Sequence, residues 1–220
     1  PEFAMKRLLA SGSGSIYQIC KVFRDDEHGR KHNSEFTMLE WYRPNLSLKE
    51  LMFEVTDLLN VTLAHRFGEV RPTILSYKHA FMDRLDLNPL QASLKQLKDC
   101  CNRVGLNLDL GDDRLGYIDL LFSHMVEQSL GFEVYIEGLE LANAYDELID
   151  AAVLRSRFEA DNLEREKLGL HVMPIDEYLL AALPNMTECS GIALGIDRLL
   201  MIATQQMKLE KVITFPADVS

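Results

Sequence analysis

The chain has 220 residues, of which 47% are hydrophobic, and its formal net charge at pH 7 is −11. This length suffices for one or two domains with a sizeable core. No run reaches the roughly 18 apolar residues of a membrane-spanning helix, so we expect no membrane association. The acidic balance argues against binding nucleic acid through a broad basic surface, but it is compatible with a local basic site for a nucleotide.

The chain begins with Pro1 rather than Met, inside a segment with a helical pattern, so we expect it to be a piece of a longer chain. Its cysteines show no CxxC spacing, which argues against a zinc site and against a secreted disulfide framework. We therefore expect a cytoplasmic protein with reduced thiols at Cys20, Cys100, Cys101 and Cys189.

Local patterns in the first third of the chain predict a helix, a hairpin and a second helix. Residues 2–10 have the apolar spacing of a helix, and a polar loop joins two strand-like runs, 16–23 and 35–44, into a long antiparallel hairpin. The run SLKE then places a Ser three residues before a Glu, a capping box that predicts an amphipathic helix over residues 47–66.

The rest of the chain alternates between helical and strand-like patterns. Segments such as SYKHAFMDRL and SLKQLKDCCNRVG predict a helical insertion over about residues 74–130. Strand chemistry returns in FEVYIEGLELANAY, EYLLAALP predicts a helix, and GIALGIDRLLMIATQQ predicts a strand end followed by a helix. VITFP predicts a final short strand. Antiparallel strands flanked by helices indicate an α+β fold.

The hairpin is the first place where chemistry is suggested. Arg24 stands at the end of the first strand, and Phe36 stands at the start of the return strand. Arg is suited to bidentate contacts with phosphate, and an aromatic ring can stack on a base. His32 and Asn33 can add hydrogen bonds to phosphate or sugar. These residues favour an anion or nucleotide site, and the alternative is a solvated loop.

Two further segments carry candidate residues. In GLELANAYDEL, Glu140 and Glu147 can meet at one Mg²⁺ if the chain turns between them; the alternative is an acidic rim. In GIALGIDRLLMI, glycines precede a helix that carries Arg198 in its first turn. A cation there is electrostatically misplaced unless the helix end holds an anion, and the alternative is a Gly-rich turn with a surface Arg.

FR, a polar loop, HNSEF and GIDR, in this order, resemble motifs 2 and 3 of class II aminoacyl-tRNA synthetases. PEFAMKRLL, FRDDEHGRKHNSEFTMLEWY and GIALGIDRLLM are most similar to the lysyl branch of that class, and the similarity extends over nearly the whole chain. It implies one catalytic domain over residues 1–220, with an antiparallel sheet flanked by helices. Motif 1, which builds the family's dimer interface, lies upstream and is absent. A further stretch of the family is missing between Gly131 and Phe132.

The lysyl branch has two members, lysyl-tRNA synthetase and its paralogue, elongation factor P–(R)-β-lysine ligase. The sequence EWYRP follows motif 2 here, whereas synthetases usually have a sequence closer to ELYMAY at this place. Ala142 and Ala193 stand where synthetases usually have Gly. One added methyl group changes the fit of a pocket by about 1–3 kcal/mol, enough to shift preference between α- and β-lysine. These residues favour the ligase. The alternatives are the catalytic domain of a tRNA-charging lysyl-tRNA synthetase and a catalytically inactive paralogue.

The resemblance also implies a mechanism and a set of site residues. ATP and Mg²⁺ activate β-lysine or lysine as an adenylate, which passes the acyl group to a lysine of elongation factor P, or to tRNA under the synthetase alternative. The nucleotide contacts implied are Arg24, Asp25, Asp26, His32, Asn33, Phe36, Glu140, Leu141, Gly195 and Arg198. The amino-acid contacts implied are Pro1, Glu2, Tyr42, Ala142, Glu147 and Ala193. Arg24 and Arg198 are the expected catalytic residues, at the α- and γ-phosphate, and Glu140 and Glu147 the expected Mg²⁺ ligands.

The chain departs from the family pattern at two of its motif positions. Asp26 replaces the usual Glu of motif 2, which shortens its reach by one methylene group, and Ala144 stands where the family has Gly. A homodimer is expected from the resemblance alone.

Overall fold

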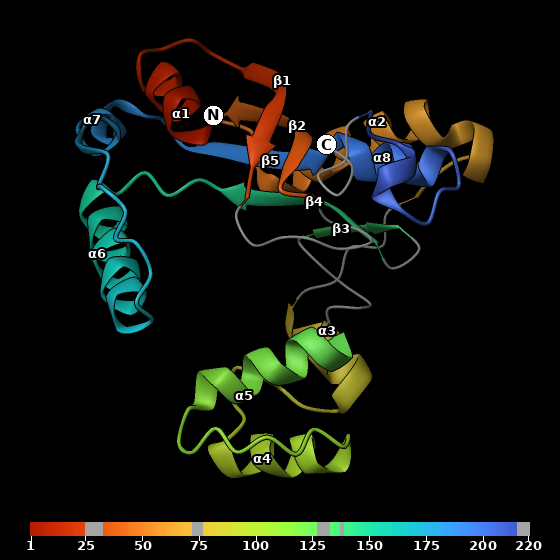
Figure 1. The fold of residues 1–220 in the computed structure, drawn as a ribbon, viewed down its shortest axis with the longest axis vertical. Coiled ribbons are helices and arrows are strands. Elements are labelled where there is room, and N and C mark those ends of the chain that lie inside the picture. Colours follow the sequence, from red (N-terminus) through yellow and green to blue (C-terminus); the bar gives the residue numbers. More distant parts are fainter. Residues whose placement is uncertain (25–32, 72–76, 127–132, 137–138, 215–220) are drawn as a thin grey trace. The chain divides into compact units, whose positions relative to one another are not determined.

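The computed structural model describes residues 1–24, 33–71, 77–126, 133–136 and 139–214 (Figure 1). The chain divides into two compact units, residues 1–70 with 144–220 (unit 1) and residues 71–143 (unit 2). Strand β4 (Leu139–Asp146) begins in unit 2 and ends in unit 1. Each unit is described by itself below.

Unit 1 contains most of the sheet and the helices that cover it. Its elements are α1 (Glu2–Ala10), β1 (Ile16–Phe23), β2 (Glu35–Pro44), α2 (Leu48–Phe67), α6 (Ala151–Lys167), α7 (Glu177–Ala182), η3 (Leu183–Asn185), β5 (Cys189–Gly195), α8 (Ile196–Ala203) and η4 (Leu209–Lys211). The strand order is β1-β2-β5-β4-β3, so β2 lies between β1 and β5. Both of its pairings are antiparallel, as the predicted hairpin requires.

The two faces of β2 pack against different helices. Side chains alternate along a strand, so odd-numbered and even-numbered residues face opposite sides. Trp41 and Arg43 face α2, where the indole N–H and the guanidinium both contact the carboxylate of Glu54. On the opposite face, Tyr42 joins the core formed by α1 and α7, which includes Met5 and other buried side chains. The chemistry described below lies on this second face.

The capping box predicted for α2 is confirmed. The Ser47 hydroxyl accepts a hydrogen bond from the backbone N–H of Glu50, and the Glu50 carboxylate accepts one from the backbone N–H of Ser47. Four leucines and valines at helical spacing, Leu51, Val55, Leu59 and Leu63, are buried. At its far end Arg66 donates to the carbonyl of Ile202, which ties α2 to the last turns of α8.

Unit 2 is mainly helical in its first part and ends in a hairpin. It contains α3 (Tyr77–Leu85), α4 (Leu94–Arg103), α5 (Arg114–Leu121), the π-helical turn η1 (Phe122–Val126), β3 (Glu133–Ile136) and the first residues of β4. Its core is built around Phe81, Leu97 and Leu121, which are fully buried. Cys100 and Cys101 belong to this core, and all four cysteines of the chain are free thiols.

The α+β class and the predicted elements are confirmed, with two differences. The strand predicted for VITFP is wrong over its described residues, because 212–214 pair with no strand and follow directly on η4. Helix α6 was not predicted. It begins at Asp150, whose carboxylate accepts the backbone N–H groups of Ala152 and Val153, and none of its residues is buried. Among the described helices, none is long and apolar enough to cross a membrane.

Candidate active site

One face of the sheet gathers most of the predicted site residues of unit 1. Phe36, Glu40 and Tyr42 alternate along β2 and therefore point to the same side. The antiparallel register places Ala193 opposite Glu40 and Gly191 opposite Tyr42. Six residues of extended strand separate Phe36 from Tyr42, roughly 20 Å at about 3.3 Å per residue. The face thus has two ends, one near Phe36 and one near Tyr42.

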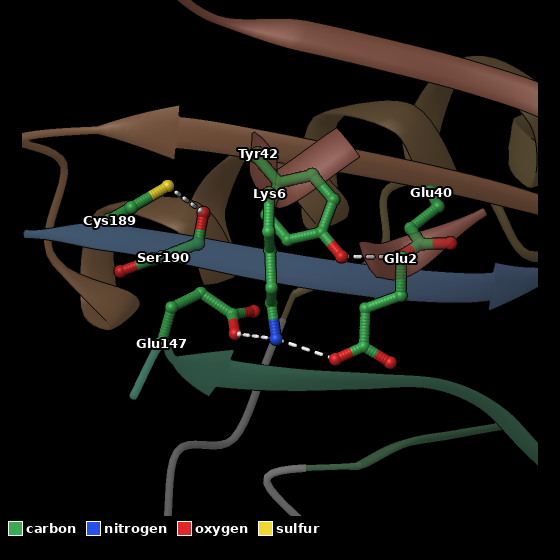
Figure 2. A network of polar contacts seen from close by, with 7 residues as sticks. All are labelled: Glu2, Lys6, Glu40, Tyr42, Glu147, Cys189 and Ser190. Atoms are coloured by element: carbon green, nitrogen blue, oxygen red, sulfur yellow. Dashed lines mark hydrogen bonds and ion pairs between the residues drawn. The ribbon is translucent and has the colours of Figure 1, made fainter. Parts of the chain in front are cut away.

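An ammonium group lies between two carboxylates at the Tyr42 end (Figure 2). Lys6, from α1, places its Nζ 2.5 Å from Oε1 of Glu2 and 2.7 Å from Oε2 of Glu147. Glu2 lies one helical turn before Lys6, and Glu147 follows directly after β4. Two residues predicted to bind an ammonium group therefore do bind one, but it belongs to the protein itself.

The Lys6–Glu147 pair is largely removed from solvent. Their side chains are 10% and 8% exposed, whereas the side chain of Glu2 is 52% exposed. Burial lowers the pKa of Lys6, but Glu147 and Glu2 outweigh it, so the pKa lies above its ordinary value and the ammonium stays charged. Burial raises the pKa of Glu147, and the Lys6 charge opposes this. Removing one partner of such a pair typically costs about 3–5 kcal/mol.

A second carboxylate–donor pair stands beside the first. The Tyr42 hydroxyl donates a hydrogen bond to Oε1 of Glu40, and both residues are buried (Figure 2). Burial and the neighbouring carboxylates raise the pKa of Tyr42 above its ordinary value, so the phenol stays neutral and remains a donor. Glu40 was not among the predicted site residues, although its spacing from Tyr42 places both on one face of a strand.

Backbone and side-chain contacts of β5 fix the position of Glu147. Its backbone N–H donates to the carbonyl of Cys189 over 2.8 Å. The preceding residue, Asp146, accepts a hydrogen bond of 2.8 Å from the hydroxyl of Ser190, which also lies 2.7 Å from the carbonyl of Leu46. Burial, and then the charge of Glu147, raise the pKa of the Cys189 thiol to about 11, so this thiol is neutral and unreactive at physiological pH.

Gly191 lets the two pairs approach the backbone of β5 closely. A Cβ atom at this position would lie 2.3 Å from Oε1 of Glu147 and 2.6 Å from Cε1 of Tyr42. Both distances are far below van der Waals contact. The missing side chain is therefore needed for the observed positions of the Glu147 carboxylate and the Tyr42 ring. Gly191 was not predicted as a site residue.

The other end of the face carries the predicted nucleotide residues. The backbone N–H of Arg24 donates to the carbonyl of Ser34, which extends the β1–β2 ladder by one bond. The Arg24 guanidinium carbon lies 6.0 Å from the ring centroid of Phe36. Asn33 is buried, and its amide donates to the carbonyl of Glu35 over 2.6 Å. Asp25, Asp26 and His32 lie outside the described residues.

The GIDR turn is held against β2. Oδ2 of Asp197 accepts a hydrogen bond of 2.6 Å from the backbone N–H of Thr37, the residue next to Phe36. Gly195 pairs with Met38 and ends β5, and Arg198 follows in the first turn of α8. The structure therefore brings the FR and GIDR motifs, far apart in sequence, to one end of the sheet.

The predicted pairing of Glu140 with Glu147 at one metal ion stays a prediction. Glu140 lies in β4 and belongs to unit 2, whereas Glu147 follows β4 directly and belongs to unit 1. Within the described ranges, no group of three His, Cys, Asp or Glu side chains could hold a metal ion.

The remaining predicted residues are placed as follows. Pro1 is exposed and precedes α1 as its cap residue. Leu141 and Ala142 are buried in unit 2, so their predicted contacts with ATP and the amino acid stay predictions. Lys6 was missed by the sequence analysis. Its spacing of four residues from Glu2 signalled an ion pair, but its contact with Glu147 depends on the tertiary fold.

Comparison with known proteins decides the family. The family described as tRNA synthetases class II (D, K and N) matches residues 1–118 and 119–219. The chain belongs to this family. Elongation factor P–(R)-β-lysine ligases of Pectobacterium atrosepticum and Edwardsiella ictaluri are each 44% identical to this class II synthetase homologue, over 99% of its length and 76% of theirs. The ligase of Photobacterium profundum is 41% identical, over 100% of this chain and 77% of its own length.

Replacing Gly191 by Ala tests the close contact between Gly191, Glu147 and Tyr42. The added methyl group must displace the Glu147 carboxylate or the Tyr42 ring, so we expect the KM for lysine or β-lysine to rise about 10- to 200-fold. ATP–pyrophosphate exchange measures this. The KM for ATP serves as internal control, because the nucleotide residues lie at the other end of the face. A variant that is folded and has an unchanged amino-acid KM would show that Glu147 and Tyr42 do not bind the amino acid.

Proposed function

We propose that this protein uses ATP to activate (R)-β-lysine, or lysine, as an aminoacyl-adenylate, and that it joins the acyl group to a lysine side chain of elongation factor P. The observation that carries the proposal is the cluster of Glu2, Glu40 and Glu147 beside Tyr42 on one sheet face, which already binds an ammonium group. A substrate with two ammonium groups suits several carboxylates better than a neutral amino acid does.

The first step needs no general base. A carboxyl group with an ordinary pKa near 3.5 is ionised at neutral pH, so the substrate carboxylate is already a nucleophile. One of its oxygens attacks the α-phosphorus of ATP, the bond from this phosphorus to the bridging oxygen breaks, and pyrophosphate leaves. The protein then contributes alignment of the two substrates and neutralisation of phosphate charge.

The roles at the nucleotide end follow from the chemistry of the residues gathered there. Arg24 is suited to the α-phosphate and Arg198 to the γ-phosphate, because a guanidinium binds phosphate oxygens in a bidentate manner. Phe36 offers a ring for stacking on adenine. Asp197 acts on the substrate only indirectly, since it holds the GIDR turn to the backbone of Thr37.

Magnesium fits this site only in part. Mg²⁺ in phosphate-transfer sites is usually held by one or two carboxylates together with phosphate oxygens. Glu140 is the carboxylate that we propose for this role. Glu147 is proposed as a second ligand through Oε1, because Oε2 of Glu147 is paired with the Lys6 ammonium. When bound, the ion would neutralise phosphate charge, and the steps described here are assigned to the protein's own residues.

The second step forms the amide. The neutral ε-amine of the acceptor lysine attacks the acyl carbon of the adenylate, the bond from this carbon to the phosphate oxygen breaks, and AMP leaves with the electron pair. The amine loses one proton to solvent. This step balances without a further reactant, and it converts the ATP consumed in the first step into AMP and pyrophosphate.

Transfer to a protein is favoured over transfer to tRNA by two observations. The similar relatives described above are named as elongation factor P–(R)-β-lysine ligases. In addition, the methyl group of Ala193 stands opposite Glu40 in the register, on the face that carries the ammonium site. tRNA-charging enzymes of the branch usually have Gly at this position, so the residue itself favours the ligase. A cytoplasmic location and a homodimer are proposed with this function.

The proposal is tested by offering the protein ATP and radiolabelled β-lysine or lysine, with either elongation factor P or lysine tRNA. We expect label on elongation factor P, with β-lysine preferred. Elongation factor P whose lysines have been reductively methylated is the control and should stay unlabelled, because a dimethylated amine cannot form the amide. Label on tRNA but not on the protein would contradict the proposal and favour the synthetase alternative.

Replacing Arg24 by Ala tests the phosphate assignment. Loss of a group that neutralises charge in the transition state typically lowers the rate 100-fold or more, so we expect amino-acid-dependent ATP–pyrophosphate exchange to fall by about that factor. Arg157→Ala is the matched control, because Arg157 is exposed on α6. Unchanged exchange in Arg24→Ala would show that the hairpin does not bind the α-phosphate.

A further inference from the structure

The geometry points to Lys6 as a positioning residue for substrate recognition: its ammonium ties Glu2 to Glu147 and so orients both carboxylates toward the substrate's own ammonium groups. This inference rests on the proposed function and deepens it. Lys6 comes from α1, as does Glu2, and it is not among the residues proposed to contact substrate.

The contacts of Lys6 use one oxygen of each carboxylate. Nζ lies 2.5 Å from Oε1 of Glu2 and 2.7 Å from Oε2 of Glu147 (Figure 2). The other oxygen of Glu147, Oε1, lies close to Gly191, 2.3 Å from the position that a Cβ atom there would take. A carboxylate has two oxygens and about four lone-pair sites, so it can accept from Lys6 and from a ligand together. Lys6 thus orients Glu147 without using up its capacity to accept.

The charges of the cluster match a substrate with two ammonium groups. Glu2, Glu40 and Glu147 are three formal anions, and Lys6 is one cation, so two negative charges remain uncompensated. Tyr42 and Cys189 face the same carboxylates and are both neutral. Lysine and β-lysine each carry two ammonium groups. Their carboxylate loses its negative charge when one of its oxygens becomes bonded to the α-phosphorus in the adenylate. Without Lys6, the three carboxylates would carry one negative charge more than the two ammonium groups of the substrate can balance.

The position of Lys6 argues that it stays when substrate binds. Its side chain is 10% exposed, and its helix neighbours Met5 and Leu9 are buried in the core with Tyr42. Moving the ammonium out of this environment would break two ion pairs at once. Glu2 behaves differently, because its side chain is 52% exposed. Without its partner, Glu2 is free to turn into solvent, and Glu147 loses the contact that orients it.

The test replaces Lys6 by Met, which keeps the length and apolar stem of the side chain but removes the charge. We expect the KM for lysine and β-lysine in ATP–pyrophosphate exchange to rise about 10- to 100-fold, as for a misplaced binding group. We expect kcat to change less than threefold, because the ammonium groups are not the reacting atoms. The KM for ATP should not change. Lys6→Arg, which restores a cation, should recover part of the loss.

Two controls separate recognition from folding. Arg7→Met changes the next residue of α1, whose side chain is 40% exposed and lies 3.4 Å from Asp176, and it should leave all three kinetic constants unchanged. Assays are run well below the unfolding temperature of each variant. If Lys6→Met does not fold, Lys6→Gln provides a neutral side chain that still donates hydrogen bonds, and the same rise in amino-acid KM is expected.

Each other outcome overturns the inference. A fall in the amino-acid KM would show that Lys6 competes with the substrate for the two carboxylates. An unchanged KM with a lower unfolding temperature would show that the pair serves only the fold. Failure of the proposed function is recognised separately, because in that case the unmodified protein itself shows no exchange that depends on lysine or β-lysine.

Discussion

The pairing of β2 with β5 is the constraint on which the site depends. It places Gly191 opposite Tyr42, Ala193 opposite Glu40 and Gly195 opposite Met38. A shift of one residue would turn Glu40 and Tyr42 to the face covered by α2 and would remove Gly191 from its position opposite Tyr42. The hydrogen bond from Thr37 to Asp197 fixes the same pairing at its other end. One register thus sets both the amino-acid end and the nucleotide end.

The amino-acid end concentrates charge where the fold alone would favour apolar residues. Glu40 is buried, and the Lys6–Glu147 pair is about nine-tenths buried. Buried ion pairs contribute little net stability, since desolvation offsets much of the attraction. Such an arrangement is therefore better explained by recognition than by stability. The surrounding core of α1 and α7 supplies apolar burial that offsets its cost.

Much of the fold followed from sequence patterns, because the decisive signals are local. The capping box before α2, the alternation in β2 and the glycine that ends β5 each depend on neighbouring residues only. The prediction of a strand at VITFP was wrong for the opposite reason. A strand requires a partner strand, and the residues of VITFP do not specify one. The contact of Lys6 with Glu147 joins distant parts of the chain, and no local pattern could show it.

The central claim is that the Tyr42 end of the sheet face binds the substrate's ammonium groups with Lys6 still in place. A crystal structure of the protein with β-lysine and a non-hydrolysable ATP analogue tests it most directly. The account predicts a ligand nitrogen within hydrogen-bonding distance of Oε1 of Glu147, beside Gly191, with Lys6 still bound to Glu2 and Glu147. A ligand whose ammonium groups lie away from Glu147, or a Lys6 displaced from both carboxylates, would contradict it.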